Sequence, residues 1–319
     1  MTGAEKIGPR PVRHALPSGV ELHALHWDPP SRATPLLRPW LLVHGLASNA
    51  RLWDGVAWRL AQQGHPVVAV DQRGHGHSSK PDDGFDMGTV ADDLRLLIED
   101  LGWSQPMVAG QSWGGNVVLE LAHRHPLAVS GIACIDGGLI ELRQRFPDWE
   151  DARTVMAPPR LLGTPIEHVR AWLEQSASDW PEEGRLGQLA NFEVRSDGTI
   201  APWLTFERHI KVLRGLWEHS PSVICSAITA PVLLVTADTG NADWSASKAA
   251  AVEAALAILP RSRAEWFHGA HHDVHAQHPE AVALLLHRAV TEPDFFRSDV
   301  RSDVPSDGGS DDATRRPPT

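Results

Sequence analysis

The sequence of 319 residues predicts an α/β fold with a mostly parallel twisted sheet, flanked by helices and interrupted by a helical insertion. Short continuous apolar runs, of the kind that form buried parallel strands, alternate with segments of helical spacing over most of the chain. Residues 141–220 break this rhythm, because they contain helical fragments but no convincing buried strand. Together these observations predict βαβ units around one core, with a helical layer inserted between two of them.

The predicted elements follow one another in a regular order. Residues 11–28 alternate well enough to form a β-hairpin around a Pro-Ser-Gly turn, and a proline-rich link follows. Continuous apolar runs that predict buried strands occupy residues 40–43, 66–70, 105–109, 132–135, 231–235 and 264–267. Helical spacing occupies residues 51–63, 87–101 and 117–125.

This order divides the chain into three parts. Residues 1–140 and 221–294 are expected to form the α/β core, and residues 141–220 a helical cap. Residues 295–319 are rich in Ser, Asp, Gly, Pro and Arg, so we expect a disordered tail. Five tryptophans of the cap are expected mainly to pack it onto the core, with one or two touching a substrate: Trp149, Trp172, Trp180, Trp203 and Trp217.

The composition argues against several functional classes. The net charge is −11 and the pI is near 5.9, and no basic stripe of the kind that binds nucleic acid is present. The two cysteines, Cys134 and Cys225, give no disulfide framework and fit a reducing compartment. No apolar run reaches the roughly 18–20 residues of a membrane span, and the first residues lack the apolar centre of a signal peptide. We therefore expect a cytoplasmic monomer or homodimer that binds neither nucleic acid nor membrane.

The most informative motif is Gly110-Gln111-Ser112-Trp113-Gly114, which reads G-x-S-x-G between a strand-like and a helix-like run. A serine in this context must lie in a very tight turn, and the flanking glycines leave room for the turn to close. Such a turn holds the Ser112 hydroxyl out from the sheet, above the helix N-terminus. The pattern therefore predicts a nucleophilic serine.

A second motif predicts a backbone N–H group that stabilises the negative charge formed when the serine attacks a carbonyl. His44-Gly45 ends a predicted strand, and the glycine allows a sharp turn that directs the backbone N–H of Leu46 into the space above the sheet. Together with the N–H of Trp113, it would form a two-donor oxyanion hole. Leu46 contributes only its backbone, because its side chain cannot donate a hydrogen bond.

Two loops contain histidines that invite other interpretations. The loop of residues 71–78 is expected to be structural, and a metal site of His75 and His77 is the weaker alternative, since no further ligands with suitable spacing are evident. The segment of residues 269–280 carries four histidines after the last predicted strand, where a general base must lie to reach Ser112. A zinc site of His271, His275 and His278 is again the weaker alternative.

With these motifs in this order, the chain resembles an α/β-hydrolase-fold serine hydrolase with a helical cap, over roughly residues 11–290. In that family the catalytic histidine commonly precedes a Pro-Glu pair by seven residues, which corresponds here to His272 before Pro279. His271 stands where the family usually has glycine, so it stays an alternative. No cofactor and no metal are implied.

The resemblance leaves three candidates for the triad acid. Most members carry it nine residues beyond the proline that opens strand seven, where this chain has Gly240, flanked by Asp238 and Asp243. One branch, including many haloalkane dehalogenases, carries it at the end of strand six, which corresponds to Asp136. We favour Asp136, with Asp238 and then Asp243 as alternatives. Dehalogenases and the related epoxide hydrolases, however, have an aspartate where this chain has Ser112.

These residues predict hydrolysis of a carboxylic ester or lactone through an acyl-enzyme, because a serine is suited to acyl transfer. The tryptophan-rich cap suggests a small, fairly hydrophobic substrate. Carbon–carbon bond hydrolases, amidases, thioesterases and cofactor-free haloperoxidase-like activities share the same constellation. A small-molecule receptor or signalling protein with this fold is the alternative from another class, and an exposed apolar patch on the cap would favour it.

Overall fold

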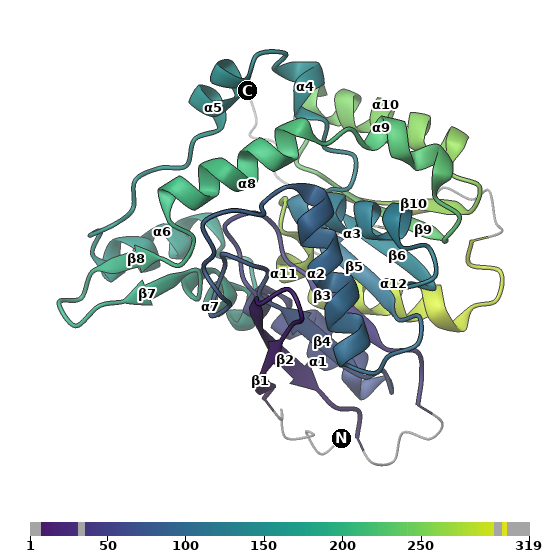
Figure 1. Cartoon of the computed structure of the whole chain (residues 1–319), viewed down its shortest axis with the longest axis horizontal. Coiled ribbons are helices and arrows are strands. Elements are labelled where there is room, and N and C mark those ends of the chain that lie inside the picture. The colour runs from purple at the N-terminus through teal and green to yellow at the C-terminus, as the bar shows by residue number, and fades with distance from the viewer. Residues whose placement is uncertain (1–7, 31–35, 241, 297–301, 305–319) are drawn as a thin grey trace, which may run out of the picture.

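A computed structural model of the chain describes residues 8–30, 36–240, 242–296 and 302–304. In this part of the chain a nine-stranded sheet forms the centre, with the strand order β1-β2-β4-β3-β5-β6-β9-β10-β11 (Figure 1). The pairs β1–β2 and β2–β4 are antiparallel, and the other pairs are parallel. The predicted α/β fold with a mostly parallel sheet is confirmed.

The strands lie close to the predicted apolar runs. They are β1 (Arg10–Ala15), β2 (Glu21–Trp27), β3 (Trp40–Val43), β4 (Val67–Val70), β5 (Met107–Gln111), β6 (Gly131–Ile135), β9 (Val232–Asp238), β10 (Ser262–His268) and β11 (Ser302–Val304). Every residue of β3, β4, β5 and β6 is buried, which explains why these strands read as continuous apolar runs and not as alternating ones.

Helices cover both faces of this sheet. They are α1 (Asp54–Gln62), α2 (Met87–Asp100), α3 (Trp113–Arg124), α9 (Pro221–Ile224), α10 (Ala242–Ile258), α11 (Val274–Gln277) and α12 (Pro279–Thr291), with 3₁₀ turns η1 (Ala50–Trp53) and η2 (Cys225–Ala227). Side chains of β3 alternate between two hydrophobic clusters: Leu41 and Val43 pack with α2 and α3, and Trp40 and Leu42 with α1 and α12. Among the described helices, none is both long and apolar enough to cross a membrane.

The segment between β6 and α9 forms the insertion, which lies at the upper left of the sheet in Figure 1. Its elements are α4 (Leu142–Arg145), α5 (Trp149–Met156), α6 (Ile166–Ser176), α7 (Glu182–Leu189), β7 (Phe192–Val194), β8 (Ile200–Pro202) and α8 (Phe206–Glu218). The antiparallel hairpin of β7 and β8 is an addition to the expected helical cap. It escapes notice in the sequence because β7 is largely exposed and each strand has only three residues.

The C-terminal segment differs in two places from the expected disordered tail. Phe295 is buried, and the Arg263 guanidinium lies 4.5 Å from the centre of its ring. Residues 302–304 form β11, which pairs in parallel with β10. The pair of phenylalanines at 295 and 296 supplies apolar surface that the average composition of the segment hides. The other residues of 297–319 lie outside the described part of the chain.

Candidate active site

Ser112 occupies a strained turn between β5 and α3. Its φ of 53° and ψ of −122° lie where residues with a side chain are rarely found. A Cβ atom on Gly110 would lie 2.1 Å from the carbonyl oxygen of Gly114, and one on Gly114 would lie 2.4 Å from that of His44. Both positions therefore require glycine, which explains the G-x-S-x-G pattern.

Two backbone segments meet at this serine. Trp113 is the first residue of α3, so its N–H has no carbonyl partner within the helix. The loop after β3 packs directly against the turn, because a Cβ atom on Gly45 would lie 2.2 Å from Gln111 Oε1 and 3.1 Å from Ser112 Cβ. Leu46 follows this glycine. The structure thus brings both predicted N–H donors, those of Leu46 and Trp113, to the neighbourhood of Ser112.

Two buried histidines, His44 and His75, make hydrogen bonds that hold the loop after β3. His44 is fully buried, its Nδ1 lies 2.7 Å from the Gly45 carbonyl oxygen, and its Nε2 accepts a hydrogen bond from the Gln72 N–H at 3.0 Å. Burial lowers the pKa of His44, so the ring is neutral with its proton on Nδ1. His75 Nε2 accepts a hydrogen bond at 3.3 Å from the N–H of Ala47, which lies in the loop after β3.

His272 is paired with Asp136. The distance between His272 Nδ1 and Asp136 Oδ2 is 2.6 Å. Asp136 follows β6, its carboxylate is 1% exposed, and its Oδ1 also accepts the Ala237 N–H at 3.0 Å. This arrangement leaves Nε2 as the free nitrogen of His272, because Nδ1 is held by the carboxylate.

The alternatives to this pair have other partners. Asp238 accepts hydrogen bonds from the Gly240 N–H at 2.8 Å and from the Ser245 hydroxyl, and lies 3.4 Å from His268 Nδ1. The side chain of Asp243 lies outside the described residues. The His271 ring packs edge-on against Trp180. Of the candidates whose side chains are described, Asp136 and His272 are the two that the structure brings together.

The electrostatic surroundings of the pair favour a charged acid and a basic histidine. Burial alone would raise the pKa of Asp136, but the hydrogen bond from His272 and the charge of Lys248 hold it below its usual value. Burial alone would lower the pKa of His272, but the hydrogen bond and charge of Asp136 outweigh this and raise it above its usual value. His272 is therefore tuned toward accepting a proton.

Three contacts around the pair could not be foreseen from spacing. The Lys248 ammonium group reaches Asp136 from α10, in a run that otherwise consists of alanines and serines. Gln111, which directly precedes the serine, donates from Nε2 to the His272 carbonyl oxygen at 3.3 Å. Gln188 of the cap donates to Asp273 Oδ2 at 2.9 Å. The histidine loop is thus held by the serine turn on one side and the cap on the other.

Gly137 offers a test of how tightly the acid segment packs against the serine turn. A Cβ atom at this position would lie 2.1 Å from the Ser112 carbonyl oxygen and 2.6 Å from its Cα. We expect Gly137→Ala to lower the free energy of unfolding by about 1–3 kcal/mol, since neither backbone can move alone. Urea denaturation measures the effect, with Gly8→Ala as control because nothing lies within 4 Å there. An unchanged midpoint for Gly137→Ala would contradict this packing.

The loop of residues 71–78 is held together by a buried carboxylate. Asp71 accepts hydrogen bonds from the Ala50 N–H at 2.7 Å, the His77 N–H at 2.9 Å and His23 Nδ1 at 2.8 Å. Burial would raise the pKa of Asp71, but the His23 hydrogen bond and the other donors hold it well below its usual range. A Cβ atom on Gly76 would lie 2.2 Å from this carboxylate. These contacts support the structural role predicted for the loop.

The histidines considered as metal ligands point to separate surroundings. His275 is buried against the Trp53 ring, with 4.2 Å between ring centres, and His278 stacks on Phe267. His77 packs on Trp203. In the described ranges, no group of three or more His, Cys, Asp or Glu side chains is arranged to hold a metal ion.

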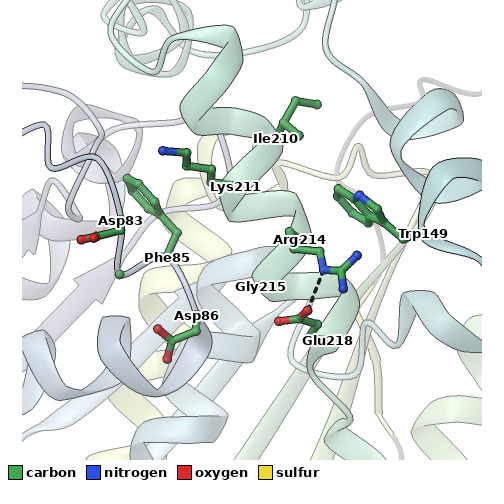
Figure 2. A pocket seen from close by; sticks show the side chains of 10 residues that line it. Asp83, Phe85, Asp86, Trp149, Ile210, Lys211, Arg214, Gly215 and Glu218 are labelled. Atoms are coloured by element: carbon green, nitrogen blue, oxygen red, sulfur yellow. Dashed lines mark hydrogen bonds and ion pairs between the residues drawn. The ribbon is translucent and has the colours of Figure 1, made fainter.

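The cap tryptophans mainly serve the packing of the cap. Trp217 and Trp149 face each other with 5.8 Å between ring centres, and the Arg214 guanidinium lies 4.6 Å and 4.9 Å from them. Trp180 packs against core residues in a small cluster, and Trp172 is 58% exposed. A groove of about 400 Å³ lies between residues 83–86 and α8, and Trp149 lines part of it. Figure 2 shows the side chains that line this groove. Neither Ser112 nor His272 lines this groove.

Comparison with known proteins agrees with the observed fold. A family model described as the alpha/beta hydrolase fold matches residues 39–279. A soluble epoxide hydrolase of Corynebacterium sp. (strain C12) is 38% identical over 111 residues, which are 34% of this chain and 38% of that protein. The 2-(acetamidomethylene)succinate hydrolase of Mesorhizobium japonicum is 34% identical over 96 residues, 30% of this chain and 34% of that protein. The matched segments thus span little more than a third of these relatives.

Solved structures resemble the chain over most of its length. The crystal structure of E-2-(acetamidomethylene)succinate hydrolase superimposes with a TM-score of 0.71 and 23% identity, covering 88% of this chain and 98% of that one. The enol-lactonase from Burkholderia xenovorans LB400 superimposes with a TM-score of 0.64 and 20% identity, covering 88% and 100%. At these identities the similarity establishes a shared fold.

Proposed function

Because the chain belongs to the α/β-hydrolase-fold family, we propose that it is a serine hydrolase that cleaves a carboxylic ester or lactone of a small, fairly hydrophobic substrate. The observation that carries this proposal is the 2.6 Å hydrogen bond between His272 and Asp136 beside a serine held in a strained turn. Acyl transfer needs an imidazole oriented by a carboxylate and a serine hydroxyl within its reach, and the segment that carries the acid packs directly against the serine turn at Gly137.

Each residue of the proposed mechanism has one task. His272 Nε2 takes the proton of Ser112 as its oxygen attacks the substrate carbonyl carbon. The N–H groups of Leu46 and Trp113 donate to the carbonyl oxygen as it becomes negative. His272 then protonates the leaving alcohol, and water, activated by the same nitrogen, releases the acid and restores Ser112. Asp136 holds the tautomer of His272 and stabilises its protonated form.

Epoxide opening, the reaction named for one of the relatives, is not the reaction that we propose for this chain. Attack of the Ser112 oxygen on an epoxide carbon would leave an ether, which a water molecule at this site has no ready means to cleave. Attack by an aspartate, which the resemblance assigns to epoxide hydrolases at this position, leaves an ester that water can resolve. The identity of residue 112 therefore favours acyl transfer over epoxide opening.

A small-molecule receptor is the second candidate. The cap exposes large apolar side chains, among them Val155 at 63%, Leu162 at 65% and Trp172 at 58%. Exposed apolar surface favours a docking role when it is contiguous. Under this alternative, the chain would bind its small molecule without turning it over.

A kinetic panel separates these functions. We expect 4-nitrophenyl esters or aliphatic lactones to be hydrolysed, with a burst of about one nitrophenolate per protein when deacylation is slow. Ser112→Ala, assayed in parallel, should show neither burst nor turnover. Hydrolysis of an aryl epoxide without hydrolysis of any ester or lactone would contradict the proposal, and so would binding of these compounds without turnover.

The raised pKa of His272 predicts the pH dependence of this activity. His272 must be neutral to accept the serine proton, so kcat/KM should rise with pH through its pKa and then level off. Because Asp136 raises that pKa, we expect the midpoint of the rise above the ordinary histidine value of about 6.5. A pH profile of ester hydrolysis by the free enzyme measures it. A midpoint below the ordinary value would contradict the pairing with a charged Asp136.

A further inference from the structure

Lys248 directs its ammonium group at the candidate triad acid. Its Nζ lies 2.7 Å from Asp136 Oδ1, 2.8 Å from Asp136 Oδ2 and 2.8 Å from the Ala237 carbonyl oxygen. A lysine has three donors, and all three are accounted for by the acid and the strand beside it. The side chain comes from α10, and it is only 32% exposed.

This contact joins two neighbouring strands at the edge where the acid lies. Asp136 follows β6 and Ala237 lies in β9, and these strands pair in parallel up to Ile135 and Val235. The Ala237 N–H donates to Asp136 while the Ala237 carbonyl oxygen accepts from Lys248. Asp136, Ala237 and Lys248 thus form a closed ring of hydrogen bonds.

The buried carboxylate needs such a partner to stay charged and fixed. Its side chain is 1% exposed, and an ionised group at this depth is costly unless it is paired and hydrogen-bonded. One oxygen, Oδ2, is shared by His272 and Lys248, while Oδ1 is shared by Lys248 and the Ala237 N–H. Rotation of the carboxylate would therefore break bonds to Lys248 and Ala237 as well as to His272.

We propose that Lys248 is a positioning residue, which holds the Asp136 carboxylate in the orientation that accepts the His272 Nδ1–H. The proposal rests on the proposed function, since it assigns Lys248 to the same triad. Lys248 does not touch the reacting atoms and acts through Asp136.

The charge of Lys248 also acts on His272. The charged groups that face His272 are Asp136 after β6, Asp273 on its own loop and Lys248 on α10. The ring of His275 in α11 also interacts electrostatically with His272. The two carboxylates raise the pKa of His272 and Lys248 lowers it. Loss of the lysine charge should therefore move the pH profile of hydrolysis toward higher pH.

The test compares Lys248→Met, Lys248→Arg and, as a control on the same helix, Ala250→Met at an exposed position. We expect Lys248→Met to lower kcat roughly 10-fold, because a misplaced triad partner costs rate without removing any reacting group. The acid side of its pH profile should move upward. Arginine should restore most of both, and Ala250→Met should resemble the wild type.

Equal losses in the methionine and arginine variants, or a wild-type rate and pH profile in a folded Lys248→Met variant, would overturn the proposal. Lys248→Gln keeps a hydrogen-bond donor without the charge, and it replaces the methionine variant if that one does not fold. For this variant we expect the same upward shift of the profile, and an unshifted profile would count against the proposal.

A spectroscopic readout separates this proposal from the proposed function. A strongly deshielded proton NMR signal is expected for the His272 Nδ1–H, and it would report the hydrogen bond to Asp136 without any substrate. We expect Lys248→Met to shift or broaden this signal and Lys248→Arg to retain it. An unchanged signal in Lys248→Met would count against Lys248 even if esters are hydrolysed. A protein that shows the predicted shift but hydrolyses no ester would instead refute the proposed function.

Discussion

Asp136→Asn is expected to lower kcat about 10⁴-fold in ester hydrolysis, whereas Asp238→Asn should leave it close to the wild-type rate. An asparagine at 136 cannot accept the His272 Nδ1–H with a negative charge, and its amide stabilises the wrong tautomer of the ring. Asp238 is engaged with Gly240, Ser245 and His268 and makes no described contact with His272.

The matched pair of variants is informative because both replace one buried or half-buried acid by its amide. Asp243→Asn completes the series, because Asp243 is the third candidate acid and its side chain lies outside the described residues, so that only a variant can test it. Steady-state kinetics on one ester, with thermal unfolding to verify folding, compares all three. A large loss in Asp238→Asn or Asp243→Asn with little loss in Asp136→Asn would move the acid to the strand β9 side and contradict the present assignment.

Ser112→Ala is expected to abolish measurable turnover, with a loss in kcat on the order of 10⁶-fold, since the covalent route is removed altogether. The fold should survive, because alanine also carries a Cβ and meets the same backbone strain at this φ of 53°. The free energy of unfolding should therefore change little.

Ser104→Ala provides the matched control for this variant. Ser104 is exposed in the segment that precedes β5. Its replacement removes a serine hydroxyl from the same βα unit without touching the site. We expect its kcat and KM to equal those of the wild type. Substantial hydrolysis by a pure Ser112→Ala variant would show that another group or an activated water attacks the substrate.

Much of the fold can be predicted from local pattern, because buried parallel strands read as continuous apolar runs. The four residues of β3 match the predicted run, β4 and β6 differ from theirs by one residue at the first position, and β5 lies two residues further along the chain than its predicted run. The serine turn is equally local, since Gly110, Ser112 and Gly114 must lie within five residues for the turn to close.

The acid could not be assigned by spacing alone, because its position depends on which strands are neighbours. Strands β6 and β9 are adjacent in the sheet, so carboxylates after either strand emerge at the same edge. Only the direction of the His272 ring distinguishes Asp136 from Asp238. The same reasoning explains why Lys248, which is 112 residues away from Asp136 in the chain, gives no signal in the sequence.

The short hairpin β7–β8 and the packed Phe295 were missed for a different reason. The hairpin consists of two three-residue strands, one of them largely exposed, so its pattern is too short to read, whereas Phe295 packs against Arg263, which lies far away in the sequence. Local composition predicts the average behaviour of a segment and not these individual contacts.

We propose that His272 and Asp136 activate Ser112 as a nucleophile. Labelling by a fluorophosphonate probe, read by intact mass on wild type beside Ser112→Ala, tests this proposal most directly, because the probe reacts with activated serines and requires no knowledge of the substrate. We expect a single adduct on the wild type and none on the variant. No adduct on a well-folded wild type, or an adduct that persists in Ser112→Ala, would contradict it.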